Sequence, residues 1–323
     1  MSKTNILILS AGRRVDLLNE FKTELTREFS WAKVYAVDLK PHLSSACQYA
    51  DEAFIAPPVV SEDYIPYLLQ LCEAKEIAMV IPTIDTELMA LAQHREAFEK
   101  NGVSVIISSP ELVEACGDKL KTAELFKELH IDSPEIYPRD GLKFPCFVKP
   151  MDGSCSIGAK ALFSPEEVSQ EMVDNPRNMF MELVPSHYQE YTIDAYFDRH
   201  GKLKCFVPRE RLETRAGEIS KGVTRRNHVY FYIATRLNQI EGAKGCITFQ
   251  LFVDEQKRDY QAIEINPRFG GGYPLSYGAG ANFPRMLIQE YLLNEEVDYS
   301  DSWENNMLML RYDAKVLVHN YES

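Results

Sequence analysis

The sequence lacks the features that would mark an exported, membrane-spanning or zinc-binding protein. Its seven cysteines, at positions 47, 72, 116, 146, 155, 205 and 246, include no C-x-x-C pair. This spacing favours free thiols in a reducing compartment over a disulfide framework or zinc site. No apolar run approaches the roughly 20 residues that a membrane span needs. The first apolar run, ILIL, is too short for a signal sequence, and AGRR follows it at once. We therefore expect a cytoplasmic protein.

Positive charge is also scarce. The chain has 35 Lys and Arg against 48 Asp and Glu, which gives a formal net charge of -13 at pH 7. An acidic chain is a poor general ligand for nucleic acid or for anionic membranes, so we expect neither as a partner. Its 323 residues, 45% of them hydrophobic, are enough for about two or three globular domains.

Two glycine signatures of nucleotide-binding proteins are missing. Residues 10–16, SAGRRVD, follow the first apolar run but carry one glycine where a dinucleotide fingerprint needs three. Asp38 resembles a ribose-binding acid, but a structural turn is the favoured reading and a nicotinamide-dependent oxidoreductase is disfavoured. A Walker A loop is excluded as well, because no GK[ST] follows the glycine-rich segment at 149–162.

The pattern of apolar residues predicts an α/β part followed by an α+β part. Short buried strands alternate with helical patterns over residues 5–108, which favours βαβ units and a mostly parallel sheet. Two helices follow, at 110–117 and 118–131. Prolines then separate β-like pieces that are typical of antiparallel strands. We expect domains at 1–113, 114–186 and 187–323.

Residues 246–254 and 258–266 predict a β-hairpin with a polar face. A hairpin symmetric about Lys257 would place Gln250 opposite Glu264, with Asn266 on the same face and Arg268 next in the alternation. Oxygen ligands of this kind suit Mg²⁺, which takes few carboxylates from a protein and completes its shell with water and phosphate. A solvent-facing strand is the alternative. The following PRFGGG, which predicts a flexible loop, favours a metal–phosphate site.

A second cluster lies at 149–162, KPMDGSCSIGAKAL. Lys149 ends a strand-like run and would supply a positive charge to a phosphate chain. Backbone N–H groups of a small-residue loop can cover a polyphosphate, although a plain hairpin turn is the alternative. The loop residues proposed to do so are Gly153, Ser154, Ser156 and Gly158.

Taken in order and spacing, these segments resemble the ATP-grasp superfamily. The segments are Lys119, FVKPMDGSCSIG, MELVP, EYTID, FQ at 249–250 and EINPRFGGG. They are most similar to the synthetase units of the carbamoyl-phosphate synthase large chain and to their stand-alone homologues. The resemblance implies a parallel-sheet, Rossmann-like preATP-grasp domain followed by an ATP-grasp fold of two α+β subdomains, the lid at 114–186 and the large subdomain at 187–323.

The resemblance also implies roles for individual residues. Lys119 and Lys149 would contact ATP phosphates, and Arg268 would face the γ-phosphate or an acyl phosphate. Glu182 and Val184 would meet the adenine edge, and Glu190 would hold the ribose. The implied metal ligands, for Mg²⁺ with Mn²⁺ as an alternative, are Gln250, Glu264 and Asn266.

Candidate substrate ligands come from the basic stretch 207–227 and from one later segment. Arg209 and Arg211 share a strand face and could clamp a carboxylate, while Lys221 could belong to a flap over the site; a solvated loop is the alternative. Asn282 is a further candidate. Asp85 and Glu87 could bind a substrate amine, although capping of the helix that follows is favoured.

Together these features predict a carboxylate–amine ligase that uses ATP and Mg²⁺ through an acyl phosphate. The expected partners are a small carboxylate and a small amine, and a homodimer is left open. Three alternatives remain. One is phosphorylation of a small carboxylate or carbamate without ligation, another is a non-catalytic ATP-binding module, and the least favoured is the oxidoreductase.

Overall fold

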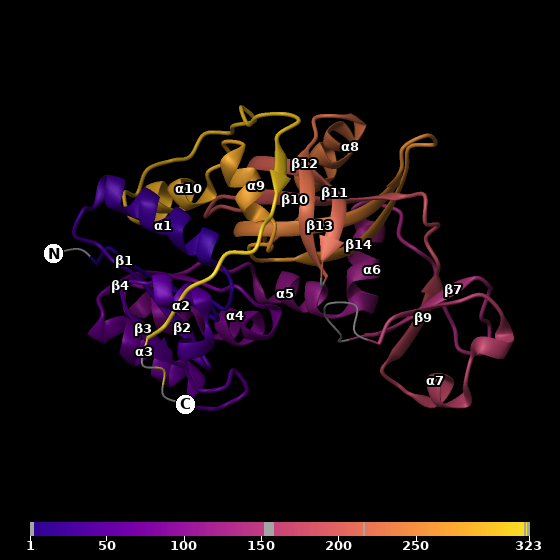
Figure 1. Ribbon diagram of the computed structural model, residues 1–323, viewed down its shortest axis with the longest axis horizontal. Coiled ribbons are helices and arrows are strands. Elements are labelled where there is room, and N and C mark those ends of the chain that lie inside the picture. Colours follow the sequence, from indigo (N-terminus) through magenta and orange to yellow (C-terminus); the bar gives the residue numbers. More distant parts are fainter. Residues whose placement is uncertain (1–2, 152–157, 216, 320, 322–323) are drawn as a thin grey trace.

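Three β-sheets, each from a separate stretch of sequence, organise the chain (Figure 1). The computed structural model describes residues 3–151, 158–215, 217–319 and 321. A five-stranded sheet contains the N-terminal strands, a six-stranded sheet lies centrally, and a four-stranded sheet projects on the side away from the N-terminal part. The predicted combination of α/β and α+β architecture is confirmed.

The N-terminal sheet is entirely parallel, as the alternating pattern predicts, in the order β3-β2-β1-β4-β5. Its strands are β1 (Asn5–Ile8), β2 (Val34–Asp38), β3 (Ala53–Ile55), β4 (Ile77–Ile81) and β5 (Ser104–Val105). Its helices are α1 (Val15–Glu28), η1 (Pro41–Leu43), α2 (Ser45–Tyr49), α3 (Tyr64–Ala74) and α4 (Asp85–Lys100). Gly102 ends α4 at a φ of +67°, as a glycine after a helix C-cap does.

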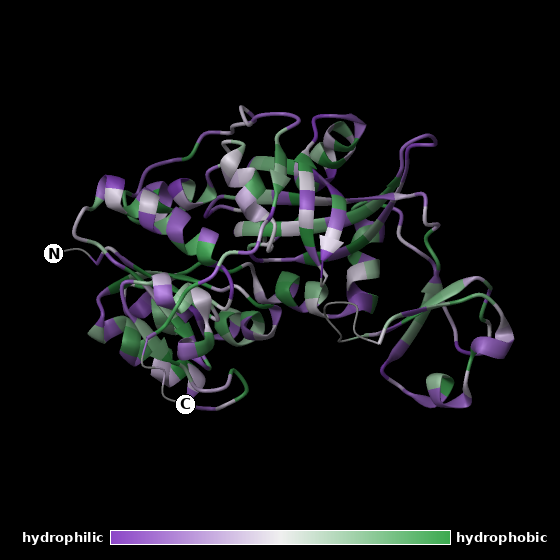
Figure 2. Cartoon of the chain, viewed as in Figure 1, coloured by the Kyte–Doolittle hydropathy of each residue, from purple (hydrophilic) through white to green (hydrophobic). Residues whose placement is uncertain are grey.

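Helix α1 joins the N-terminal part to the rest of the molecule. Figure 2 shows it with both hydrophilic and hydrophobic bands, as an amphipathic helix should have. Its fully buried Phe21 lies edge-on to Phe269, with ring centroids 5.8 Å apart, and both belong to one core shared with the six-stranded sheet. Burial of each ring contributes roughly 2–3 kcal/mol.

The four-stranded sheet is antiparallel, in the order β6-β9-β7-β8, and has a small core of its own. Its strands are β6 (Ile136–Tyr137), β7 (Cys146–Pro150), β8 (Lys160–Leu162) and β9 (Asn178–Glu182). Its helices are η2 (Pro165–Glu167) and α7 (Gln170–Asp174).

The six-stranded sheet is antiparallel in the order β14-β13-β10-β11-β12-β15. Its strands are β10 (Gln189–Phe197), β11 (Leu203–Arg215), β12 (Glu218–Thr224), β13 (Gly245–Asp254), β14 (Asp259–Asn266) and β15 (Leu308–Leu310). Its helices are α8 (His228–Leu237), α9 (Tyr273–Gly278) and α10 (Phe283–Tyr291). One face is apolar and lies in the core; the other carries the polar residues described below.

Two helices connect the N-terminal sheet to the others, α5 (Pro110–Gly117) and α6 (Lys119–Glu128). Asp118 caps α6 by accepting hydrogen bonds from the N–H groups of Leu120 and Lys121. Phe126 of α6 packs against Phe249 at 5.6 Å between centroids, so α6 lies on the six-stranded sheet rather than on the four-stranded one. The expected boundary at 113/114 falls inside α5. Among the described residues, no helix is long and apolar enough to cross a membrane.

Candidate functional site

The polar face of the six-stranded sheet brings Gln250 and Glu264 together. They are direct partners on β13 and β14, and Thr248 pairs with Asn266. The hairpin is not symmetric, however. A register shift between Gln250 and Leu251 places Leu251 opposite Ala262, so β14 has one extra residue there. The predicted pairing is thus correct, but it is the bulge, not a centred turn, that produces it.

Hydrogen bonds connect this pair to the loop that follows β14. Asn266 Nδ2 donates to Glu264 Oε1 at 3.0 Å, and Arg268 Nη2 donates to Asn266 Oδ1 at 3.3 Å. Thr248 Oγ1 donates to the Arg268 carbonyl oxygen at 3.0 Å. The carboxylate, the amide and the guanidinium therefore form one continuous chain along a single face, as their alternation in the sequence predicts.

Arg211 extends this polar face across the sheet. It forms an ion pair with Glu190 on the neighbouring strand and donates to Gln250 Oε1 at 3.5 Å. Burial raises the pKa of the Glu190 carboxyl; the Arg211 charge opposes this shift and the Glu264 charge adds to it. Glu190 and Glu264 are therefore close enough to interact, and Arg211 offsets their repulsion.

One lysine from outside this sheet lies near Glu264, and a second lysine lies near the first. Burial lowers the pKa of Lys149, on β7, to about 8; the nearby Lys119 ammonium contributes, while Glu264 acts in the opposite direction. Lys119, the first residue of α6, donates to the carbonyl oxygens of Pro150 at 2.9 Å and Met151 at 2.6 Å. Two ammonium groups that are near enough to repel each other are an arrangement that a bound polyanion stabilises.

The donor set fits a magnesium–phosphate complex. Gln250, Glu264 and Asn266 supply one carboxylate and two amide oxygens, and Mg²⁺ takes such hard ligands in small number. The Nε–H groups of Arg211 and Arg268 are buried and, within the described part of the chain, have no hydrogen-bond partner. A buried donor without a partner is costly, so a ligand oxygen at this place would remove a penalty. No cluster of three or more His, Cys, Asp or Glu among the described residues offers a different metal site.

Arg268 also contacts the N-terminal part, which sequence reasoning did not foresee. Its Nη2 donates to Asp85 Oδ2, at the start of α4, at 2.5 Å. Glu87 is the residue that caps α4: it accepts hydrogen bonds from the N–H groups of Thr83 at 2.7 Å and Ile84 at 3.2 Å. The favoured capping role therefore belongs to Glu87, whereas Asp85 orients Arg268.

The four candidate substrate ligands have different environments. Arg209 is 1% exposed and forms a two-point ion pair with Asp194, so it supports the fold and does not face a ligand. Lys221 lies in β12, not in a flap, and pairs with Glu213 at 2.7 Å. Asn282 caps α10. The geometry therefore favours only Arg211 among the four. The basic stretch is a β11–β12 hairpin, not a solvated loop.

Close packing requires two of the three glycines that follow Phe269. A Cβ on Gly272 would lie 2.3 Å from Arg209 Nη1, and one on Gly270 would lie 2.9 Å from Thr248 Oγ1. None of the three has a positive φ. Instead of the flexible loop that the sequence predicts, residues 270–272 form a tight segment laid over the buried Arg209–Asp194 pair.

The expected nucleotide contacts outside the six-stranded sheet are only partly described. Glu182 ends β9, and its N–H donates to the Glu135 carbonyl oxygen at 2.8 Å; Val184 follows in the connection to β10. Gly158 has a φ of +77°, which favours glycine. The other three candidates of the glycine loop, Gly153, Ser154 and Ser156, lie outside the described residues.

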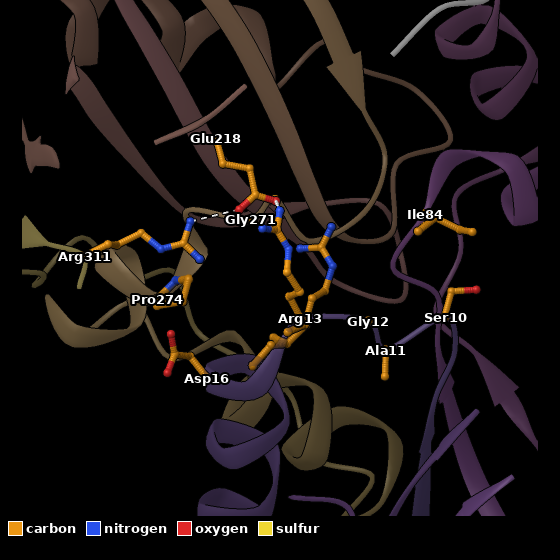
Figure 3. A pocket seen from close by; sticks show the side chains of 13 residues that line it. Ser10, Ala11, Gly12, Arg13, Asp16, Ile84, Glu218, Gly271, Pro274 and Arg311 are labelled. Carbon is orange, nitrogen blue, oxygen red and sulfur yellow. Dashed lines mark hydrogen bonds and ion pairs between the residues drawn. The ribbon is translucent and has the colours of Figure 1, made fainter. Parts of the chain in front are cut away.

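A cavity lies between the N-terminal part and the glycine segment (Figure 3). Residues 10–14 and Ile84 line one side, while Glu218, Gly271 and Arg311 line the other. None of its charged residues is predicted from the sequence as a ligand. Arg13, Arg14 and Asp16 lie in SAGRRVD and Glu218 lies in the stretch 207–227, but only the fold brings them together with Arg311.

Comparison with known proteins agrees with this architecture. Residues 6–106 match the model of the PylC-like N-terminal domain, and residues 174–313 match that of the ATP-grasp in the biosynthetic pathway with Ter operon. No curated protein matches.

Solved structures show the same fold over nearly the whole chain. A biotin carboxylase–β,γ-ATP complex from Campylobacter jejuni has a TM-score of 0.72 and 16% identity, covering 94% of this chain and 74% of its own. The biotin carboxylase domain dimer of Hydrogenobacter thermophilus 2-oxoglutarate carboxylase, with MgADP, ADP and bicarbonate, has a TM-score of 0.71 and 15% identity. The match covers 94% of this chain and 73% of that one. An L-amino acid ligase from Bacillus licheniformis has a TM-score of 0.66 and 16% identity, and the match covers 90% of this chain and 75% of that one.

The fold and the family models define an ATP-grasp architecture that follows a parallel α/β domain. The chain combines a PylC-like N-terminal domain, matched over residues 6–106, with an ATP-grasp part, matched over residues 174–313. The predicted ATP-grasp resemblance and the predicted fold class are confirmed by the family models and by the shared fold of these structures.

Proposed function

We propose that the protein is an ATP- and Mg²⁺-dependent carboxylate–amine ligase that forms a carbon–nitrogen bond through an acyl phosphate, as carbamoyl-phosphate synthase units do. One observation carries the proposal. Lys149 of β7 lies near enough to Glu264, the partner of Gln250 on the six-stranded sheet, and to Lys119 of α6 for both charges to affect the Lys149 pKa. This combination of a hard-cation ligand set with buried ammonium groups suits a nucleotide triphosphate.

The nucleotide would lie between the four-stranded and six-stranded sheets. Lys119 and Lys149 would bind its phosphates, with Gly153, Ser154, Ser156 and Gly158 covering them. Glu182 and the backbone at Val184 would meet the adenine edge. Glu190 would hold the ribose hydroxyls, and its ion pair with Arg211 supports this role because it fixes the carboxylate.

The metal would be held by Glu264, Gln250 and Asn266. When bound, Mg²⁺ supplies charge neutralisation and alignment of the phosphate oxygens. The hydrogen bond from Asn266 to Glu264 supports this assignment, because it keeps both side chains on the same face.

The chemistry then needs position and charge, not a side-chain nucleophile. A carboxylate oxygen of the substrate attacks the γ-phosphorus in line, the bond to the β–γ bridging oxygen breaks, and ADP leaves. Arg268 faces the transferred phosphoryl group and stabilises its charge. The amine then attacks the acyl carbon, phosphate leaves, and the amine proton is lost to yield the amide. Closure of the site excludes water, which would otherwise hydrolyse the acyl phosphate.

The N-terminal sheet does not favour the oxidoreductase alternative. Asp38 Oδ2 accepts a hydrogen bond from the Gly12 N–H at 2.9 Å, so this carboxylate stabilises the β1–α1 turn where a ribose would otherwise be expected. The structural turn that the sequence favours at residues 10–16 is therefore explained by this hydrogen bond between Asp38 and Gly12.

The test is an ADP- and phosphate-release screen with MgATP against pooled amino acids and small carboxylates. A ligase releases ADP in the presence of a carboxylate and forms an amide only when an amine is added. Release without amide in every amine pool would instead support simple phosphorylation. Nucleotide binding without release in any pool would support a non-catalytic module. NADH binding without ATP binding would reject the proposal.

A further inference from the structure

The cavity between the N-terminal part and the glycine segment combines charges that the ligase mechanism does not use. Figure 3 shows Arg13 and Arg311 directed toward Glu218 from opposite sides of the cavity. Arg13 Nη2 lies 3.5 Å from Glu218 Oε1, and Arg311 Nη1 donates to Glu218 Oε2 at 3.1 Å. Two guanidinium groups therefore share one carboxylate.

A third arginine adds to the positive charge. Arg14 donates from Nη2 to the Thr83 carbonyl oxygen at 2.9 Å, which fixes the group at the cavity wall. Burial, followed by the nearby Arg268 charge, lowers the pKa of Arg14 to about 10. With three arginines against Glu218 and Asp16, the lining has an excess of positive charge and both signs are present.

The cavity adjoins the proposed reaction site. Its wall includes Gly270 and Gly271, which lie two and three residues after Arg268 in the sequence. In addition, Arg14 in the wall is near enough to Arg268 for their charges to repel each other. Arg268 in turn contacts Asn266 of the proposed metal site. A small molecule in the cavity could therefore have one end at the arginines and its reacting end near Arg268.

We propose that this cavity binds a substrate through a free carboxylate that does not react, with Arg13 and Arg311 as its ligands. The class comprises molecules with a second carboxylate that can be phosphorylated. These are small dicarboxylates and the acidic α-amino acids aspartate and glutamate, in which the α-carboxylate is held and the other carboxylate reacts. If the substrate is an amino acid, the carboxylates of Glu218 and Asp16 pair with its ammonium group. The inference rests on the proposed function and names its substrate class.

The present ion pairs are suited to such an exchange. The Arg13 side chain is 76% exposed, and exposed ion pairs contribute little to stability. Arg13 can therefore turn from Glu218 to a ligand at small cost, and a carboxylate offers guanidinium groups two-point hydrogen bonding.

The test uses the full-length protein in an ADP-release assay with MgATP. The panel contains the twenty α-amino acids, their α-carboxamides, malonate, succinate and glutarate, alone and in pairs. The variants are Arg13→Gln and Arg311→Gln, with Arg95→Gln on α4 as the matched control. Direct titration of the same compounds, with MgADP present, provides a readout that does not depend on turnover. Since Arg13 is exposed, its variant remains informative if Arg311→Gln fails to fold.

We expect turnover of aspartate, glutamate or a dicarboxylate, but not of the α-carboxamides of aspartate and glutamate, which keep the reacting carboxylate and lack the one that the arginines hold. Both cavity variants should raise the KM for the acid by roughly tenfold or more and leave the KM for ATP within about twofold, with Arg95→Gln like wild type. The active panel members distinguish amino acids from dicarboxylates. If the carboxamides are turned over as fast as the acids, or if both variants keep the wild-type KM for the acid, the proposed role of the cavity is wrong, but the proposed ligase function still stands. Binding that Arg13→Gln abolishes, without any turnover, would uphold the cavity and reject the ligase; neither binding nor turnover would reject both.

Discussion

Arg268 and Asp85 form an ion pair between the segment after β14 and the start of α4, with Nη2 and Oδ2 2.5 Å apart. This pair connects the residue proposed to face the γ-phosphate with the N-terminal part of the chain. The N-terminal part is therefore more than a structural support: through Asp85 it orients a guanidinium that also contacts Asn266.

Asp85→Asn should lower kcat by about tenfold. Without the charged partner, the Arg268 guanidinium is less well positioned against the transferred phosphoryl group, and poor positioning of a catalytic group slows the reaction. The effect on the free energy of unfolding should be below about 1 kcal/mol, since Asp85 is half exposed. Steady-state kinetics and urea denaturation measure the two effects. Glu96→Gln, on the exposed side of the same helix, is the control. Equal kcat in the two variants would show that the pair has no role in orientation.

Arg209→Gln should destabilise the fold by roughly 3–5 kcal/mol, because it leaves Asp194 as an uncompensated buried charge. Asp194 accepts hydrogen bonds from both Arg209 and Ser276, so the pair also connects β10 and β11 to α9. Arg215→Gln on the same strand removes only an exposed ion pair to Asp313 and serves as the control. Chemical denaturation of both variants compares the losses. A loss in Arg209→Gln no larger than in the control would contradict the structural role assigned to this residue.

Gly272→Ala should lower both stability and activity, since its Cβ would meet Arg209 Nη1 at 2.3 Å. Overpacking of this kind costs about 1–3 kcal/mol. Gly278→Ala is the matched control, because the nearest atom to its Cβ is Met307 Sδ at 3.7 Å. Thermal melts and ADP release report the outcome. If both alanine variants behave alike, the glycines do not serve close packing.

Nucleotide binding should become weaker above about pH 8. In the free protein burial lowers the pKa of Lys149 to about 8, so its ammonium group loses its proton as the pH rises through that value. Bound phosphates would favour the charged form and raise this pKa, so binding near pH 8–9 should take up protons. Calorimetry of MgADP binding in buffers of different ionisation enthalpy measures the uptake. Lys149→Met should remove it; unchanged proton uptake in that variant would assign the effect to another group.

The parts of the site that could be predicted from the sequence are those in which side chains alternate between the two faces of a strand. Gln250, Glu264, Asn266 and Arg268 lie on one face because alternate residues of a strand must do so. Lys221 was placed in a flap because the polar stretch around it hides the β11–β12 pairing, in which charged side chains lie on the exposed face.

Contacts between distant segments could not be predicted in the same way. Asp85 and Arg268 are 183 residues apart, and Arg13, Glu218 and Arg311 come from three separate segments of the chain. No local pattern in the sequence encodes such pairs. The contacts of Asp85 and Arg13 arise only when the N-terminal sheet docks against the central one, and the Glu218–Arg311 contact depends on the pairing of β12 with β15. The burial of Arg209 was missed for a related reason, because its partner Asp194 lies on a neighbouring strand and the strand alternation alone does not distinguish a buried ion pair from a ligand-binding face.

The proposed metal and nucleotide site is tested most directly by Glu264→Gln, which keeps the size of the side chain and removes its charge. We measure calorimetric binding of a non-hydrolysable ATP analogue with and without Mg²⁺, together with ADP release, in wild type, Glu264→Gln and the exposed control Glu241→Gln. The predicted result is Mg²⁺-enhanced binding in wild type and control, loss of that enhancement in Glu264→Gln, and turnover reduced about 100-fold or more. Glu264→Gln with wild-type Mg²⁺ dependence and turnover would contradict the assignment.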